Sequence, residues 1–230
     1  MSQYFIPGAP DLSVTLKRSA RAKRYSLRVS RLDGRVTLTI PTHASERDAL
    51  GFAAEKADWL RKVLEHSVRA HRPEFGGQVP FEGRMLKITQ GAVKTPRVEG
   101  DALLMPAGED RLSARLETFL KFHARARVTQ ASDHYCARLG RAYSKITMRD
   151  ARSRWGSCAP DGALMYNWRL IMAPVAVLDY VCAHEVAHLA QMNHSPAFWA
   201  VVADLRPSYP AERHWLKQHG TQLQALRFRD

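Results

Sequence analysis

Residues 181–190 constrain the fold of this chain more than any other part of its sequence. Seven apolar residues surround three polar ones there, namely His184, Glu185 and His188. A helix that is apolar nearly all round is buried, and burying two imidazoles and a carboxylate without partners costs free energy. The segment therefore predicts a core helix, opened by Pro174, whose polar residues share either a bound metal or a satisfied hydrogen-bond network.

The spacing of the three polar residues favours the metal. Residues four apart lie on one face of a helix, so His184 and His188 can hold the same ion. Glu185 projects about 100° around the helix from His184, where its carboxylate can reach a metal-bound water without being a ligand. A carboxylate in that place can accept the proton of a water that attacks a carbonyl carbon. The pattern predicts a hydrolytic site with one zinc ion per chain, although imidazole ligands would also accept cobalt, nickel or copper.

His194 is the expected third ligand, because a catalytic zinc site usually has three protein ligands and a water. It stands six residues after His188 and beyond the expected helix end, where Asn193 tolerates the left-handed conformation that ends a helix. Ser195 as a cap and Pro196 at the first position then open another helix. His194 is thus expected at a corner between two helices. Two weaker ligand candidates lie on a later amphipathic segment: His214 and His219.

Four stretches of the C-terminal half carry distinctive residues: SRWGSC, YNWRLI, LDYV and HEVAHLAQMNHSPAFW. In these stretches the chain resembles the YgjP-like metallopeptidase family, which is related to SprT-like and other zincin domains. The resemblance is dense over residues 145–220. It implies a zincin-like catalytic domain with the active-site helix packed on a small mixed sheet, His194 as the third zinc ligand, and a peptide or protein substrate. Gln191 stands where metzincins have a glycine, so the resemblance does not extend to that group.

Four further residues are candidates for contacts with a substrate or a transition state: Arg152, Arg154, Asn167 and Tyr209. Either arginine could bind a substrate carbonyl or a carboxylate near the metal, or could bridge structural elements through its five donors. Asn167 lies on or near the strand before the metal helix, where a substrate strand could pair. The Tyr209 hydroxyl could stabilise an oxyanion, or the residue could form a turn between helices.

The chain is strongly basic, with a formal net charge of +13. Its densest cluster of basic residues is Lys17, Arg18, Arg21, Lys23 and Arg24. Such charge attracts nucleic acid and other acidic partners, although a solvated basic hairpin would explain the cluster equally simply. The alternative function is therefore a basic nucleic-acid-binding protein with a structural or vestigial zinc site. Structural zinc sites usually have four protein ligands and favour cysteine, which disfavours this alternative.

Other sequence features bear on the compartment. No apolar run approaches the roughly 20 residues that span a bilayer, so no membrane partner is expected. The first residues lack the basic and apolar regions of a signal peptide. The three cysteines, Cys136, Cys158 and Cys182, form no CxxC motif. We therefore expect a reduced, cytoplasmic protein without disulfides.

Residue patterning predicts an α+β fold. Period-two alternation and glycine punctuation predict N-terminal strands at 13–17, 25–29, 36–40, 85–89 and 102–105. Asp33-Gly34 is the expected hairpin turn between the second and third of them. Helical periodicity predicts one helix that is capped by Ser45 and reaches Leu64.

The C-terminal half is expected to contain the chemistry. A long helix is expected over 110–139, followed by a strand at 145–149 and a strand pair that ends near Ile171. Pro106-Ala107-Gly108 is the expected boundary. It would separate a β-rich N-terminal region with one helix, residues 1–108, from the zincin-like metallopeptidase domain, residues 109–230.

Overall fold

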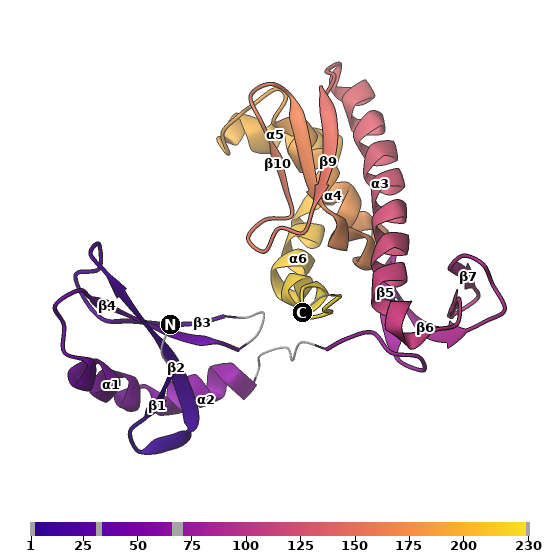
Figure 1. The fold of residues 1–230 in the computed structure, drawn as a ribbon. Helices are drawn as coiled ribbons and strands as arrows, with labels where there is room; N and C mark the ends of the chain where they lie inside the picture. The colour runs from indigo at the N-terminus through magenta and orange to yellow at the C-terminus, as the bar shows by residue number, and fades with distance from the viewer. Residues whose placement is uncertain (1–2, 31–33, 66–70, 229–230) are drawn as a thin grey trace. The chain divides into compact units, whose positions relative to one another are not determined.

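The computed structural model describes residues 3–30, 34–65 and 71–228 (Figure 1). The chain forms two compact units, Met1–Ala70 and His71–Asp230. Each unit has an apolar core of its own. The described residues form six α-helices and three small sheets, each with parallel and antiparallel pairs. This mixture agrees with the predicted α+β fold.

The first unit is a four-stranded sheet with two helices. Its strands, in the order in which they pair, are β1(Gln3–Ile6), β2(Ala9–Ser19), β4(Val36–Pro41) and β3(Ser26–Val29). The helices are α1(Glu46–Glu55) and α2(Ala57–Glu65). All three strands expected before residue 45 are confirmed, and Ser45 caps α1 by accepting a hydrogen bond from the Asp48 amide. The single helix expected after Ser45 is two helices, with Lys56 between them.

The antiparallel pairing of β3 with β4 agrees with the predicted hairpin. Gly34 has the positive φ of 67° that such a turn requires, and Asp33 lies outside the described residues. One face of the sheet carries alternating apolar residues that are fully buried, among them Val14, Leu38 and Ile40. They share a core with residues of α1 and α2, so the two helices cover this face.

The second unit begins with another four-stranded sheet, whose order is β5(Gln78–Phe81), β6(Arg84–Gln90), β8(Ala102–Met105) and β7(Arg97–Glu99). After it come a short 3₁₀ helix, Glu109–Arg111, and the long helix α3(Leu112–Leu139). Leu86, Ile88 and Leu103 are fully buried and belong to the same core as Leu116 and Leu120 of α3. This sheet is therefore packed on the helix that follows it.

The division between the units lies at residues 70 and 71, and not at 108 as the sequence predicted. Arg115 of α3 donates to the carbonyls of Pro106 and Ala107, which ties the expected linker to the helix. In the turn between β5 and β6, a Cβ at Gly83 would come within 2.9 Å of the Pro174 Cα. Residue 71 also pairs with Leu226 near the C-terminus. These contacts join residues 71–108 to the second unit. The buried apolar side chains of this segment are part of the core of that unit.

A three-stranded sheet of the second unit lies beside the metal helix. Its order is β10(Gly156–Cys158), β11(Ala163–Asn167) and β9(Lys145–Arg149), and a 3₁₀ helix, Trp168–Met172, leads from β11 to α4(Val175–Ala187). The strand expected up to Ile171 therefore ends at Asn167. The side chain of Asn167 explains why the strand ends early. Its Oδ1 accepts a hydrogen bond from the Arg169 amide and caps the 3₁₀ helix. The chain finishes with α5(Pro196–Leu205) and α6(Tyr209–Leu223).

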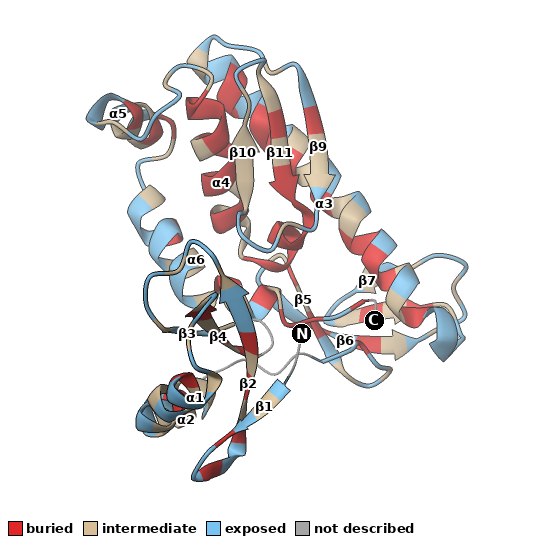
Figure 2. Cartoon of the chain, turned by 60° about the vertical axis from the view of Figure 1, so that its left-hand side comes forward, coloured by how far each residue is buried: buried red, intermediate tan, exposed pale blue. Residues whose placement is uncertain are grey.

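Helix α4 is buried on most of its sides, as Figure 2 shows and as the apolar sequence predicted. It contacts α3, α5, α6 and β10. Arg169, just before it, is also buried and is satisfied by two ion-pair contacts with Asp150 and by the carbonyls of Leu223 and Leu226. These bonds fasten the entrance of α4 to β9 and to the C-terminal end of the chain.

The compartment predictions are tested only in part. None of the helices formed by residues 3–30, 34–65 and 71–228 is both long and apolar enough to cross a membrane. All three cysteines are free thiols, as expected. The cytoplasmic location stays a prediction.

Candidate metal centre

Three histidines converge at the C-terminal end of α4. His184 is in the last turn of the helix, His188 is its C-cap, and His194 lies in the connection to α5. The Nε2 atoms of His184 and His194 are 3.1 Å apart. One ligand atom from each of the three residues lies within 4.8 Å of the others. The structure thus brings together the three residues that the sequence predicted as ligands.

The geometry of these rings fits a metal ion. Two nitrogens bound to a tetrahedral zinc at about 2.0–2.1 Å would be about 3.3 Å apart, close to the separation of His184 and His194. Burial lowers the pKa of His184 to about 3 and also lowers the pKa of His188. Both rings are therefore neutral at neutral pH, which is the form that binds metals.

Hydrogen bonding orients His188 toward the cluster and leaves one nitrogen of His184 without a partner among the described residues. The Nδ1 atom of His188 is 3.0 Å from the Gln191 carbonyl oxygen, to which it can donate, and this leaves Nε2 free as a ligand. The Nδ1 atom of His184 is buried and has no hydrogen-bond partner among the described residues. With Nε2 of His184 as the ligand atom, this Nδ1 has no partner among those residues with or without a metal, so the fit to a metal rests on the spacing of the three rings.

Glu185 lies beside the histidines on α4 and is only 5% exposed. Its side chain packs against the backbone of Gly156 in the edge strand β10, where a Cβ would come within 2.5 Å of Oε1 and 2.6 Å of Cγ. Burial raises the pKa of Glu185 to about 8, and Arg154 acts in the opposite direction. A nearby cation would lower this pKa further and favour the carboxylate that a general base requires.

Aromatic rings from α5 hold the histidines in place. Phe198 is fully buried and stacks on His188 with ring centroids 4.4 Å apart. Trp199 stacks on His194 with centroids 5.9 Å apart. The cap by Ser195, which accepts from the Phe198 amide, sets the start of this helix. His194, the predicted third ligand, is thereby fixed by a helix that begins immediately after it.

A guanidinium adds positive charge on the other side of the site. Arg213 of α6 lies over the ring of Trp199, 4.7 Å from its centroid. Its charge contributes to the lowered pKa of His184, after the larger effects of burial and of the other two histidines. Arg213 acts on His184 and Arg154 acts on Glu185, so the two arginines make the site electropositive from two different elements.

Comparison with known families shows to which family the chain belongs. A model of the YgjP-like family, described as the YgjP-like metallopeptidase domain, matches residues 23–219. The chain belongs to this family. No curated protein and no solved structure matches the chain. The three-histidine cluster of this YgjP-like metallopeptidase domain lies within the matched residues and fits a metal site.

The predicted contact residues of the YgjP-like domain have different surroundings. Arg154 is exposed and acts electrostatically on Glu185. Arg152 is exposed as well. Asn167 is fully buried, donates from Nδ2 to the Ala151 carbonyl at 2.7 Å and caps the 3₁₀ helix, so both ends of its amide already have partners. Asn167 therefore holds the 151–155 loop, and its contact with a substrate stays a prediction.

Two other expectations meet different outcomes. Tyr209 stacks on Trp199 with centroids 5.4 Å apart, one ring away from His194. Its role with an oxyanion stays a prediction. The backbone of Asn193 is not in the left-handed conformation. In the described part of the chain, the non-glycine residue with a positive φ is Glu82. Instead Asn193 Oδ1 accepts from the Ser195 amide at 3.2 Å, and this side-chain turn leads His194 into α5.

Sequence reasoning missed three residues beside the histidines and Glu185, namely Gly156, Arg213 and Tyr180. Gly156 was part of a recognised motif, but its contact with Glu185 joins a strand to a helix far along the chain, and no local pattern reveals it. Arg213 lies on α6, at a spacing from the motif that carries no signal. Tyr180 could have been found, because it precedes His184 by four residues and therefore lies on the same helix face. Its ring is 5.9 Å from that of His184.

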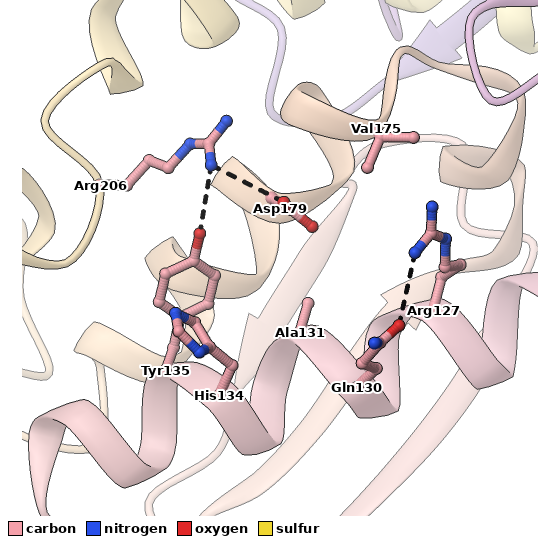
Figure 3. Close-up of a pocket in the computed structure, with 8 residues that line it drawn as sticks. All are labelled: Arg127, Gln130, Ala131, His134, Tyr135, Val175, Asp179 and Arg206. Atoms are coloured by element: carbon pink, nitrogen blue, oxygen red, sulfur yellow. Dashed lines mark hydrogen bonds and ion pairs between the residues drawn. The ribbon is translucent and has the colours of Figure 1, made fainter.

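A cavity of about 300 Å³ lies behind the metal helix, between α3 and α4 (Figure 3). Asp179 lines it and lies about 140° around α4 from His184, so the cavity is separate from the metal centre. Arg206 crosses it and contacts Asp179 at 3.7 Å, Tyr135 at 3.5 Å and Glu212 at 3.0 Å. These bonds tie α3, α4 and α6 together, and they position the start of the helix that carries Arg213.

Replacing Gly156 by alanine is expected to lower hydrolytic activity by about a hundredfold, because displacing a reacting group by about 1 Å can have that effect. The new methyl group would meet the Glu185 side chain at both Oε1 and Cγ, so the carboxylate must move. Bound metal should stay unchanged, since the three atoms nearest to the added Cβ all belong to Glu185, which is outside the three-histidine cluster. The measurement is kcat and metal content of the same preparation.

Gly51→Ala is the matched control for Gly156→Ala. A Cβ at Gly51, in α1, meets nothing within 4 Å. This control should keep full activity, and it should stabilise the helix by about 0.5–1 kcal/mol. Full activity of Gly156→Ala would mean that the position of the Glu185 carboxylate does not matter for hydrolysis.

Proposed function

We propose that this chain is a zinc metallopeptidase that hydrolyses peptide bonds of peptide or protein substrates. In this proposal His184, His188 and His194 hold one zinc ion, and Glu185 is the general base. The observation that carries it is the convergence of three imidazoles next to one buried carboxylate. A site with three protein ligands is typical of catalytic zinc, and the exposed side chain of His194 leaves one side open to solvent.

A bound zinc ion supplies Lewis acidity and acidifies water. The residues of the chain supply the remaining functions. His188 is oriented by its bond to Gln191, and Phe198 packs against its ring. Glu185 would accept the proton of the attacking water and return it to the amine that leaves. Its burial against Gly156 holds the carboxylate in one place and excludes bulk water from it.

The two arginines and Tyr209 are proposed to act on the substrate. Arg154 and Arg213 raise the positive potential in which an oxyanion would form, and preorganised charges of this kind lower the barrier of acyl transfer. The Tyr209 hydroxyl is the candidate hydrogen-bond donor to that oxyanion. The packing of α4 beside the sheet β10-β11-β9 supports the assignment of this unit as zincin-like.

Removing the metal tests the proposal directly. Treatment with a strong chelator, followed by dialysis, is expected to abolish cleavage of an unfolded protein substrate. One equivalent of zinc should restore it, because the ligand rings are positioned without the ion. Cleavage is followed by mass spectrometry of the peptides released. Unchanged hydrolysis by protein without measurable metal would contradict the mechanism.

A further inference from the structure

The four-stranded sheet of the first unit has a second face, opposite the one covered by α1 and α2. Strand residues alternate between faces, and the apolar ones pack under the helices. The pairing registers place the others in adjacent rows: Phe5 beside Ser13, Gln3 beside Thr15, Thr37 and Arg28, and Lys17 beside Thr39 and Ser26. These nine residues form the outer sheet face.

The outer sheet face is basic and contains no acidic residue. Lys17 and Arg28 are exposed, and the loop that follows β2 adds the exposed side chains of Arg21, Lys23 and Arg24. None of these five cations forms an ion pair with a residue that the structure describes. They extend from the middle of the sheet to one of its ends.

The acidic residues of this unit are placed elsewhere. Those that the structure describes are Asp11, Glu46, Asp48, Glu55, Asp58 and Glu65. All but Asp11 lie on α1 and α2. Asp11 is held by Arg61 of α2 at 2.9 Å. The described carboxylates are therefore confined to the helix side of the unit, where Arg47, Lys56 and Arg61 also lie, so the outer sheet face is not neutralised by neighbouring carboxylates.

The polar groups between the cations suit a nucleic acid strand. Threonine and serine hydroxyls and the Gln3 amide can bond to phosphates, sugars and base edges. Phe5 is 72% exposed at one end of the face, where its ring is available for stacking on a base. Insertion into a membrane would use several apolar side chains, whereas Phe5 is the large apolar one among these nine residues and hydroxyl and amide groups predominate.

We propose that the outer sheet face and the loop after β2 bind single-stranded nucleic acid. The five cations contact phosphates, and Phe5 stacks on a base. The three rows span about 13 Å along β2, at about 6.7 Å for every second residue. This binding does not depend on the proposed peptidase activity, and Glu185→Gln protein is expected to bind with unchanged affinity.

The test uses the full chain and fluorescein-labelled oligo(U) of about 20 nucleotides, longer than the site of one small binding fold. Anisotropy is measured as the KCl concentration rises from about 50 to about 300 mM. Five phosphate contacts predict a slope of about −3.5 for log affinity against log salt concentration. The double variant Lys17→Gln/Arg28→Gln is expected to bind at least about tenfold more weakly at low salt, with the slope reduced by about 1.4. Phe5→Ala should weaken binding by about tenfold with little change in slope.

Matched controls distinguish binding by the outer sheet face from an effect of the overall charge of the protein. Arg47→Gln/Lys56→Gln removes the same charge from exposed positions at the helices and should leave the affinity unchanged. Lys17→Arg/Arg28→Lys should retain binding, and thermal melts show whether each variant is folded. The proposal is overturned by absence of binding at the lowest salt concentration, or by equal losses in the two glutamine variants. Tighter binding to vesicles rich in phosphatidylserine, or to a polyglutamate chain, also overturns it.

Discussion

Replacing Glu185 by glutamine is expected to lower peptide hydrolysis by about a thousandfold, within the range of general acid–base catalysis. An amide of nearly the same size still fills the space against Gly156, but it cannot accept the proton of the attacking water. The metal should remain at about one ion per chain, because Glu185 is outside the three-histidine cluster. The measurements are kcat and metal content of the same preparation.

The same variant should change the pH dependence of stability in metal-free protein. Burial raises the pKa of Glu185 from 4.5 to about 8. The folded state therefore keeps a proton that the unfolded chain releases, and stability falls as the pH rises from about 4.5 to about 8. The lowered pKa of His184 has the opposite effect at lower pH, but it is present in both proteins. The melting temperature of Glu185→Gln relative to wild type should thus increase between about pH 5 and about pH 8.

Two outcomes would contradict this account of Glu185. Equal hydrolysis by wild type and Glu185→Gln would exclude it as the general base. A difference in melting temperature that is independent of pH would mean that the carboxylate is already ionised in the metal-free fold. The first result concerns catalysis and the second concerns burial, so either can occur without the other.

Replacing His194 by alanine is expected to weaken metal binding by more than about a hundredfold. Loss of a residue that only hydrogen-bonds to a metal ligand typically weakens binding by roughly 10- to 100-fold, and loss of a ligand should cost more. Hydrolysis should be lost with the metal. His194 is exposed, so the metal-free variant should melt close to the metal-free wild type. His188→Ala should lose metal as well, and should also be less stable, because its ring is buried against Phe198.

Metal affinity is measured by competition with a chromophoric chelator, on protein made without a metal-binding tag. His214→Ala and His219→Ala are the controls, since both residues lie on α6 and outside the three-histidine cluster. They should bind metal as the wild type does. Tight metal binding by His194→Ala would exclude the three-histidine site and would leave His184 and His188 in need of another ligand.

The parts of the fold that were predictable depend on neighbours in sequence. The strands at 13–17, 25–29 and 36–40 follow from alternation, and the caps at Ser45 and Ser195 follow from a side chain that bonds to an amide three residues later. The metal helix was predictable for the same reason. Its apolar flanks and the four-residue spacing of its histidines are both readable within one short segment.

The errors occur where distant segments compete with local signals. Pro106-Ala107-Gly108 has the composition of a linker, yet the bonds from Arg115 make it part of the second unit. The strand expected to reach Ile171 stops because Asn167 caps a 3₁₀ helix and binds the Ala151 carbonyl. In each case the prediction failed because a hydrogen bond joins residues that lie outside the short segment from which the prediction was made.

The sequence by itself therefore determined the metal helix, its three candidate ligands and the family, because these depend on residue type and spacing over short distances. Only the tertiary structure decided how Glu185 is held and charged. Gly156 lies against it because the edge strand β10 packs beside α4. Arg213 acts on His184 from α6, a separate helix that begins at Tyr209, so its place in the site depends on the packing of α6 against α4.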